Sequence, residues 1–338
     1  MSLVVRPARL TDLPTMLEFA RLSGAGFTSL PEDEPLLASK LAKSEAAFAA
    51  SATDEERRAG YLLMLEKAGL TSPVGCAAVK PGVGLEEPFF NFRIMKIAQA
   101  SFAAQRRFDL DVLMLVNDYA GCTEVGTLFL HPDHRGGGAG SLLSLSRFLL
   151  IASDPERFDE RILAELRGYC DDDGRSPFWE RLGRTFFKMD FADADHFCAT
   201  SDKQFIIDLM PKYPIYAELL PEDARAVIGK CHPDGLPAMA MLEREGFRFE
   251  GVVDIFDAGP LVSVPRKDLA TLQNSVQLPI AVYDIGDAQR LLISNDKING
   301  FRATLAPVRI TRDAMLVSQA TLDSLNMKAG DVGRVRLK

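Results

Sequence analysis

The chain has 338 residues and a formal net charge of −8, and 47% of its residues are hydrophobic against 25% charged. This is the composition of an ordinary globular protein, long enough for two domains or for one domain with a sizeable extension. The acidic balance argues against a surface that binds nucleic acid or an anionic membrane. No apolar run reaches the roughly 18 residues needed to span a bilayer, and the N-terminus does not have the pattern of a signal peptide.

The cysteines and histidines indicate neither a disulfide framework nor a metal site. The five cysteines are dispersed, odd in number and never form a C-x-x-C pair. The four histidines lack metal-ligand spacing, apart from the loop pair His131 and His134, and a loop pair without further ligands is better explained by solvated side chains. We therefore expect a protein of the reducing cytoplasm, with no metal and no bound cofactor.

The N-terminal part alternates predicted helices and strands. Residues 8–24 are predicted to be a helix with Thr11 as its N-cap and Pro14 in its first turn. An alanine-rich helix follows over residues 36–50, either as a lid over a site or as an ordinary surface helix. The predicted strands cover residues 3–6, 60–67, 74–79, 88–97, 113–116 and 124–130. Together they predict a mostly antiparallel sheet.

A glycine-rich turn follows the last of these strands and leads into a helix. His131-Pro132-Asp133 ends the strand, because proline cannot donate to a ladder. Four glycines then occur within five positions, and apolar residues recur at helical spacing from Ser141, which predicts an amphipathic helix. Glycines before a helix let backbone N–H groups converge on an anion. The stretch is predicted to be a pyrophosphate cradle, and the alternative is a turn without a ligand.

The spacing of the glycines distinguishes between the known phosphate-binding loop motifs. The Walker pattern ends in Gly-Lys-Ser/Thr, which is absent, and the dinucleotide pattern would place its last glycine at Ser141. Arg135, Gly138 and Gly140 instead fit Arg-x-x-Gly-x-Gly between a strand and a helix. This arrangement resembles the acyl-CoA loop of the general-control N-acetyltransferase (GNAT) superfamily. The resemblance implies an α+β acyltransferase fold, with the CoA pyrophosphate on the loop and the pantetheine along the preceding strand.

In the region after the loop, a unit of a helix followed by a strand is predicted twice. A strand is expected over residues 161–168, followed by a short helix over 176–183 that leads to a strand at Phe186-Phe187. A second helix–Gly-Phe–strand unit is predicted over residues 237–249. The acyltransferase region is therefore either elaborated or partly duplicated.

Domain boundaries follow from this pattern. Residues 1–265 are predicted to form the GNAT-like region, with a degenerate second copy of the fold within 170–265 as one interpretation of the repeated unit. Residues 270–338 contain short β-like runs and a single short helix. They predict a small β-rich, barrel-like domain with an accessory or interface role.

His232 is the best candidate for acid–base chemistry. It precedes Pro233, which fixes a turn and so is expected to hold the imidazole at a loop mouth. Imidazole titrates near neutral pH, which suits either removal of a proton from an attacking amine or its return to the leaving thiolate. The alternatives are an exposed loop histidine without a role, and a covalent route through Cys231 that no second feature supports.

Longer strings carry a more specific resemblance. They are Cys122-Thr123-Glu124, Thr127-Leu128-Phe129-Leu130, Pro132-Asp133, Ser146-Arg147-Phe148, Ser176-Pro177-Phe178-Trp179, Leu209-Met210-Pro211-Lys212, Val227-Ile228-Gly229, His232-Pro233, Gly246-Phe247-Arg248 and Asp254-Ile255-Phe256-Asp257-Ala258-Gly259-Pro260. These strings are similar to the arginine N-succinyltransferase family as far as about residue 265, with a looser fit in the tail. The resemblance implies transfer of succinyl from succinyl-CoA to the α-amino group of L-arginine, the first step of an arginine catabolic route. It also implies that His232 is the proton donor and that Leu128 contacts succinyl-CoA.

The remaining site residues are assigned by what the reaction needs. The predicted CoA-binding residues are Leu128, Phe129, Leu130, Arg135, Gly136, Gly137, Gly138, Ala139, Gly140 and Ser141. The succinyl and arginine carboxylates need cationic partners, and the guanidinium needs carboxylates. The candidates are Arg93, Arg167 and Lys212 for the former and Glu165, Asp254 and Asp257 for the latter. For each of them a solvated charge or a structural ion pair is the alternative.

Three other functions stay open at this point. They are an arginine/ornithine succinyltransferase subunit, an N-acetyltransferase that uses acetyl-CoA on another amine, and a CoA-binding subunit without activity of its own. The expected partners are the small molecules succinyl-CoA, as co-substrate, and L-arginine, with no nucleic acid and no membrane. The sequence leaves both a homo-oligomer and a hetero-oligomer with a paralogous subunit open.

Overall fold

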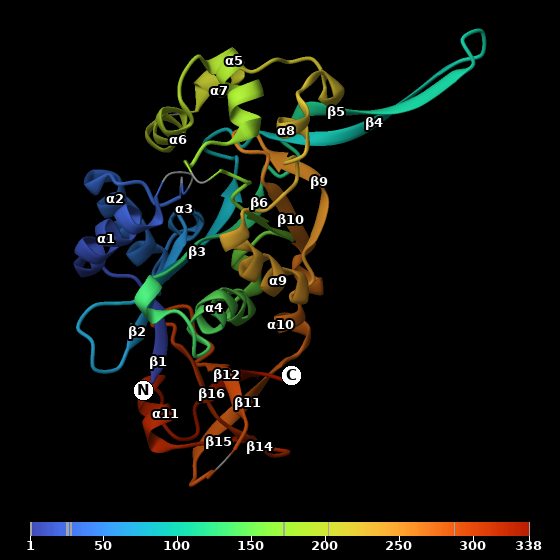
Figure 1. Cartoon of the computed structure of the whole chain (residues 1–338). Helices are drawn as coiled ribbons and strands as arrows, with labels where there is room; N and C mark the ends of the chain where they lie inside the picture. The colour runs from blue at the N-terminus through green and yellow to red at the C-terminus, as the bar shows by residue number, and fades with distance from the viewer. Residues whose placement is uncertain are drawn as a thin grey trace.

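The computed structural model describes residues 2–24, 27, 29–171, 173–201, 203–286 and 288–337, and in this part of the chain sixteen strands form one continuous sheet (Figure 1). The first strands are β1 (Leu3–Pro7), β2 (Tyr61–Lys67), β3 (Gly75–Val83), β4 (Asn91–Ser101), β5 (Arg106–Val116), β6 (Cys122–Leu130) and β7 (Arg161–Glu165). The middle strands are β8 (Ile215–Tyr216), β9 (Arg248–Asp254) and β10 (Pro260–Pro265). The last are β11 (Ser275–Val282), β12 (Arg290–Ser294), β13 (Ala303–Pro307), β14 (Arg309–Ile310), β15 (Met315–Val317) and β16 (Val332–Arg336).

The sheet is mostly antiparallel, as predicted. Its order is β14-β15-β11-β16-β12-β13-β1-β2-β3-β6-β7-β10-β9-β4-β5-β8. Among the described residues, only the pairs β6–β7 and β11–β15 run parallel. Strand β6 leads into the predicted glycine loop, and β7 follows the helix after that loop. The parallel pair β6–β7 therefore lies at the candidate site.

Helices cover the sheet in three groups (Figure 1). The helices are α1 (Leu13–Ser23), α2 (Glu34–Phe48), α3 (Asp54–Arg58), α4 (Ala139–Ser153), α5 (Arg184–Phe187), α6 (Phe191–Thr200), α7 (Gln204–Leu209), α8 (Glu222–Arg225), α9 (Leu236–Arg244), α10 (Ala270–Gln273) and α11 (Gln319–Ser324). Helices α1 and α2 pack on one face of β2, β3 and β6, and α4 packs on the other with α9 and α10 beside it. Helices α5 to α8 cover the end of β4, β5 and β9. No described helix is long and apolar enough to cross a membrane.

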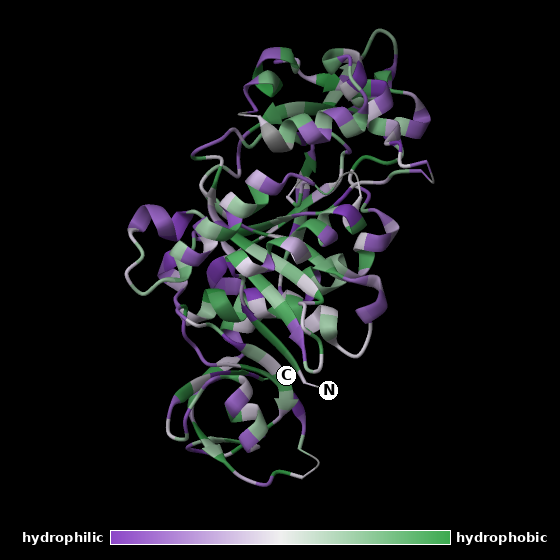
Figure 2. Ribbon diagram, turned by 90° about the vertical axis from the view of Figure 1, so that its left-hand side faces the viewer, coloured by the Kyte–Doolittle hydropathy of each residue, from purple (hydrophilic) through white to green (hydrophobic). Residues whose placement is uncertain are grey.

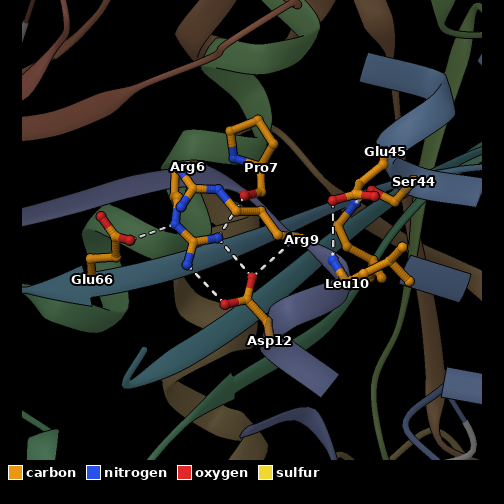
Figure 3. A network of polar contacts seen from close by, with 9 residues as sticks. Arg6, Pro7, Arg9, Leu10, Asp12, Ser44, Glu45 and Glu66 are labelled. Carbon is orange, nitrogen blue, oxygen red and sulfur yellow. Dashed lines mark hydrogen bonds and ion pairs between the residues drawn. The ribbon is translucent and has the colours of Figure 1, made fainter. Parts of the chain in front are cut away.

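The start of α1 is fixed by Asp12, and the prediction that Thr11 is the N-cap is wrong. Asp12 Oδ2 accepts a hydrogen bond from the Arg9 N–H at 2.8 Å, and both carboxylate oxygens of Asp12 bind the Arg6 guanidinium at 2.7 and 2.9 Å (Figure 3). Arg6 also donates to Glu66 on β2 at 2.5 Å. A charged carboxylate bound to a buried guanidinium is a stronger anchor than a threonine hydroxyl. This network ties β1, β2 and α1 together below the site.

Helix α4 is buried nearly all round, so the predicted amphipathic helix from Ser141 is wrong in its start and its outer face. It begins at Ala139, and most of its side chains from Leu142 to Ala152 are buried. One side packs on the sheet, and the other is covered by residues of α9, α10, β12 and β13. The sequence of α4 alone does not reveal this cover, because the covering segments lie about 90 to 160 residues further along the chain.

The predicted strand at Phe186-Phe187 is wrong. These residues belong to α5, which continues a helical turn over Trp179–Gly183. The Trp179 ring stacks on Phe187, with ring centroids 5.4 Å apart. Aromatic residues favour strands in general, but here they are held in a helix by packing around Trp179. The predicted unit over residues 237–249 is present as α9 and β9, and a second copy of the fold stays a prediction.

Strands β4 and β5 are longer than predicted and form a hairpin that extends away from the body of the molecule (Figure 1). The sequence of β5 begins with charged residues such as Arg106, Arg107 and Asp109, which do not show the alternation of a half-buried strand. They form a strand here because a free hairpin exposes both of its faces. Phe102, in the turn, is 99% exposed.

The C-terminal strands curl into a ring at the bottom of the molecule (Figure 2) and enclose a core of their own. They also continue the main sheet, because β13 pairs with β1 at Val4↔Thr304 and Val5↔Ala303. Leu305 on β13 lies near the glycine loop, since a Cβ on Gly138 would meet its Cδ2 at 3.3 Å. The accessory role of this region stays a prediction, although its position brings it beside the candidate cradle.

Candidate functional site

The seam between β6 and β7 opens at a bulge. Within the described residues the two strands pair only at Thr123↔Ile162 and Glu124↔Leu163. Beyond this point β6 gains one residue relative to β3, and Thr127 takes a φ of 49°, a left-handed conformation that is costly for a β-branched residue. The rest of β6, up to Leu130, keeps its pairing with β3 and has none with β7 in this part of the chain. Its free backbone edge is suited to bind an extended, amide-rich ligand.

The loop after β6 presents backbone rather than side chains. Gly136, Gly137 and Gly138 have φ values of 99°, 59° and 86°, a region that glycine enters without strain. A Cβ on Gly136 or Gly137 would meet nothing within 4 Å, so these residues face open space. Gly138 is the N-cap of α4, whose first N–H groups lack intrahelical partners. Free amides and the positive end of a 15-residue helix form a site for an anion.

Basic side chains stand beside this loop. Arg135 is exposed, and Lys67 Nζ lies 3.4 Å from His134 Nδ1. The rings of His131 and His134 are 5.5 Å apart between centroids. The loop therefore combines backbone donors with cations from β2 and from its own turn, which is the chemistry that a pyrophosphate requires.

His232 is held in a fixed orientation at the end of β7. Its backbone N–H donates to the Arg167 carbonyl at 2.8 Å, and Gly168 forms a β-bridge with Cys231. In the side chain, Nδ1 accepts a hydrogen bond from the Asp234 N–H at 3.2 Å. A neutral ring that accepts at Nδ1 carries its proton on Nε2. The side chain is 18% exposed, so the ring is mostly buried and part of it faces solvent.

Three carboxylates gather beside the His232 segment. Asp257 accepts hydrogen bonds from the N–H groups of Gly168 at 2.6 Å and Gly259 at 2.8 Å. Burial, reinforced by the charge of Asp257, raises the pKa of Asp254 to about 8. Water reaches Glu165 at the sheet surface, but the surrounding protein and the charge of Asp254 raise its pKa well above the ordinary value. Carboxylates in this state favour the binding of a cation, which would stabilise their ionised forms.

The predicted substrate-binding residues divide into two groups. Glu165 lies in the carboxylate cluster and accepts a hydrogen bond from Asn91 Nδ2 at 3.2 Å. Arg167 lies beside it, and its buried Nε has no hydrogen-bond partner among the described residues. Arg93, in contrast, is bound to Asp118 at 2.6 Å. Lys212 is exposed in the turn after α7 and has no hydrogen bond or ion pair within the part of the chain that the structure describes.

Several residues of the candidate site carry no recognisable pattern in the sequence. Asn91, at the start of β4, is buried and bound to Glu165. Lys40 on α2 and Lys203 before α7 lie close enough to Glu124 on β6 for their charges to lower its pKa, which burial raises. A local pattern does not mark these residues, because they come from distant parts of the chain. Only Glu124 had a signal, as a member of one of the matching strings.

The described residues contain no group of three or more histidine, cysteine, aspartate or glutamate side chains arranged to hold a metal ion. The five cysteines are free. A metal-free site and a cytoplasmic location stay predictions.

Two family models match the chain. Residues 3–271 match arginine N-succinyltransferase beta subunit, and residues 276–335 match the C-terminal domain of the same subunit. The arginine N-succinyltransferase subunit beta of Pseudomonas aeruginosa is 43% identical over 330 residues, which cover 97% of this chain and 96% of that protein. The arginine N-succinyltransferase of Yersinia pestis is 39% identical over 339 residues, which cover 98% and 96%.

A solved structure has the same fold over the whole chain. It is the arginine/ornithine succinyltransferase subunit AI from Pseudomonas aeruginosa, with a TM-score of 0.90 and 30% sequence identity, and it covers 99% of this chain and 98% of that chain. The predicted α+β acyltransferase fold is confirmed by this likeness.

Proposed function

Because the chain belongs to the arginine N-succinyltransferase family, we propose that it transfers the succinyl group of succinyl-CoA to the α-amino group of L-arginine. The observation that carries the proposal is the position of His232. Its turn is hydrogen-bonded to the end of β7, and β7 is the strand from which β6 separates at the bulge. The free edge of β6 and the candidate acid–base group therefore lie on the same seam of the sheet.

The donor is expected to bind along β6. The pyrophosphate of succinyl-CoA would accept hydrogen bonds from the loop amides and from Arg135, and the pantetheine amides would pair with the free edge of β6 up to Leu130. The thioester carbonyl would then lie at the bulge, beside Leu128. Backbone N–H groups directed at a developing oxyanion stabilise the tetrahedral intermediate, typically by about 2.7–4 kcal/mol for one donor.

The acceptor is expected to bind on the side of His232. L-Arginine brings a guanidinium and an α-ammonium, and Glu165, Asp254 and Asp257 provide negative charge for them. Their raised pKa values support this assignment, because an unliganded acidic cluster resists ionisation until a cation enters.

His232 would act as the proton donor. The attacking amine must lose a proton, and the departing CoA thiolate must gain one. His232 would give its Nε2 proton to the thiolate sulfur and take up the amine proton at the same nitrogen, so the ring returns to its starting tautomer. Nε2 is the nitrogen open to this exchange, because Nδ1 accepts a hydrogen bond from the Asp234 N–H. Direct attack of the amine on the thioester needs no covalent acyl-enzyme, and burial raises the pKa of Cys231 to about 11, which makes its thiolate scarce near neutral pH.

A second candidate function is supported by one observation. The structure with a TM-score of 0.90 is described as an arginine/ornithine succinyltransferase subunit, so ornithine is a further acceptor to be tested. The description as a subunit also supports a hetero-oligomer as one arrangement of this chain.

A thiol-release assay tests the proposal. The purified chain should release CoA from succinyl-CoA in the presence of L-arginine, and faster than it does from acetyl-CoA. Comparable kcat/KM for L-ornithine would favour the broader acceptor range. A clear preference for acetyl-CoA would contradict the proposal, and activity that appears only after addition of a paralogous chain would identify a subunit that is inactive by itself.

A further inference from the structure

A second charged cluster lies on the α1–α2 face of the sheet, next to the bulge, and the reaction described so far does not use it. It consists of Lys40, Lys80, Lys203, Glu87 and Glu124, which come from α2, β3, the segment before α7, the loop after β3 and β6. We call it the lysine cluster. Lys80 and Glu87 are exposed, whereas Lys40, Lys203 and Glu124 are partly buried. The like charges of the lysines are costly for the partly buried members unless a ligand of opposite charge binds.

The position of the lysine cluster follows from strand register. Lys80 and Glu124 are direct cross-strand partners on β3 and β6, so their side chains point to the same face. Val125, the next residue, packs in the core below α4, which places Glu124 on the opposite face, that of α1 and α2. The Glu124 carboxylate lies over Gly126, towards the bulge, since a Cβ on Gly126 would meet Glu124 Oε1 at 2.9 Å. The cluster therefore adjoins the residue at which the bulge begins.

The cations of this cluster are incompletely paired. Lys203 Nζ forms an ion pair with Glu87 at 3.2 Å. Lys40 Nζ donates to the Ser29 carbonyl at 2.9 Å, and no carboxylate lies within ion-pair distance of Lys40 or Lys80 in the described residues. Burial, together with the charges of Lys80 and Lys203, lowers the pKa of Lys40 to about 8. An anion between these ammonium groups would relieve both their repulsion and the cost of burying Lys40.

We propose that the lysine cluster binds the free carboxylate of the succinyl group, with Lys40 as its main contact, and so selects succinyl-CoA over donors with an uncharged acyl group. This inference rests on the proposed function. It replaces Arg93 and Lys212 as candidates for this carboxylate, since Arg93 is bound to Asp118 and Lys212 is exposed in the turn after α7.

Two substrates bring a carboxylate to the site, and position favours that of the donor. In succinyl-CoA only two methylene groups separate the carboxylate from the thioester, which we expect at the bulge. The lysine cluster surrounds Glu124, three residues before the bulged Thr127. The acceptor is expected among the carboxylates near His232, where a bound cation would favour the ionised forms of Glu165 and Asp254, whose pKa values are raised without it. Lys203 interacts with both Glu124 and Glu165, so it lies between the two sites, and Lys40 gives the cleaner test.

Binding of matched donors to variants tests the proposal. Butyryl-CoA has the acyl chain of succinyl-CoA with a methyl group in place of the carboxylate, and it serves as the uncharged probe. Dissociation constants for both donors are measured by calorimetry for the wild type, Lys40→Met, Lys203→Met and Lys43→Met. Lys43 is exposed on the same helix and is the matched control. A charge-assisted hydrogen bond corresponds to roughly a 10-fold or larger change in affinity.

The expected result is a wild-type preference for succinyl-CoA that falls roughly 10-fold or more in Lys40→Met, with butyryl-CoA affinity and the Lys43→Met variant unchanged. Retained butyryl-CoA binding also shows that the variant is folded. An unchanged preference in Lys40→Met overturns the proposal. A second contradictory result concerns the acceptor. In it, Lys40→Met keeps the normal donor preference and raises the KM for L-arginine, but leaves unchanged the KM for agmatine, which lacks the carboxylate. This result would place the arginine carboxylate at the cluster and overturn the proposal. Failure of the wild type to transfer succinyl to L-arginine would instead overturn the proposed function.

Discussion

Two turns of this protein share the sequence His-Pro-Asp and nearly the same geometry. His131 and His232 each precede a 3-10 turn, with ψ values of 132° and 141°, and each accepts at Nδ1 from the N–H of the following aspartate, at 3.3 and 3.2 Å. Their side chains are 23% and 18% exposed. In both, the ring is held as the tautomer that carries its proton on Nε2.

From their surroundings we infer different roles for the two turns. The turn of His131 leads into glycines and the N-terminus of α4, with Lys67 and Arg135 nearby. The turn of His232 is bonded to the end of β7, next to Asp257 and Glu165. A cationic, amide-rich environment suits phosphate, and an acidic one suits an ammonium group and proton transfer. Local sequence determines the conformation of such a turn, and long-range contacts determine its chemistry.

The largest expected effect separates the two histidines by catalysis. His232→Ala should lower kcat by about 10²–10⁴-fold, the usual contribution of a positioned acid or base, and leave the affinity for succinyl-CoA almost unchanged. His131→Ala, the matched variant, should act mainly on the KM for succinyl-CoA. Steady-state thiol release measures both. Equal losses of kcat in the two variants would remove the distinction between the turns.

A smaller effect is expected from the phosphate side. Arg135→Ala should raise the KM for succinyl-CoA about 10-fold by removing a charge-assisted contact, while kcat at saturating donor stays near that of the wild type. Arg175→Ala, another exposed arginine, is the control. If Arg135→Ala lowered kcat without a change in KM, the loop would have a role in chemistry rather than in binding.

The last expected effect is on stability rather than on turnover, and it concerns the acidic surroundings of His232. Asp254 has an ordinary pKa of 3.8 and a folded-state pKa of about 8. Between these values the folded chain keeps a proton that the unfolded chain has released, so the free energy of unfolding should fall as pH rises. Asp254→Asn should flatten this dependence, as measured by urea unfolding at pH 5 and pH 8. The exposed Asp133→Asn in the other turn is the control, and equal slopes in wild type and Asp254→Asn would contradict the raised pKa.

Sequence reasoning reached the parts of the site that depend on local pattern. The glycine loop, the strand before it and the turn at His232 are each readable from a short stretch, because turns and helix starts are determined by neighbouring residues. The role of Glu165 was predicted from the needs of the substrate, and the structure brings it together with Asp254 and Asp257 beside His232.

The parts that sequence reasoning missed depend on contacts between distant segments. Arg93 was predicted to bind a substrate carboxylate, but its guanidinium is already paired with Asp118. Lys40 and Asn91 join the site only through the packing of α2 and the end of β4. The outer face of α4 is buried in part by strands of the C-terminal region. The hydrophobic pattern of α4 alone does not show which segment packs on that face.

The most direct test of the central claim is the identity of the product. The purified chain is incubated with succinyl-CoA and L-arginine, and the product is analysed by tandem mass spectrometry. One succinyl group on the α-nitrogen of arginine is expected for each CoA released. Release of CoA without succinylarginine, or succinylation of the guanidinium, would contradict the central claim.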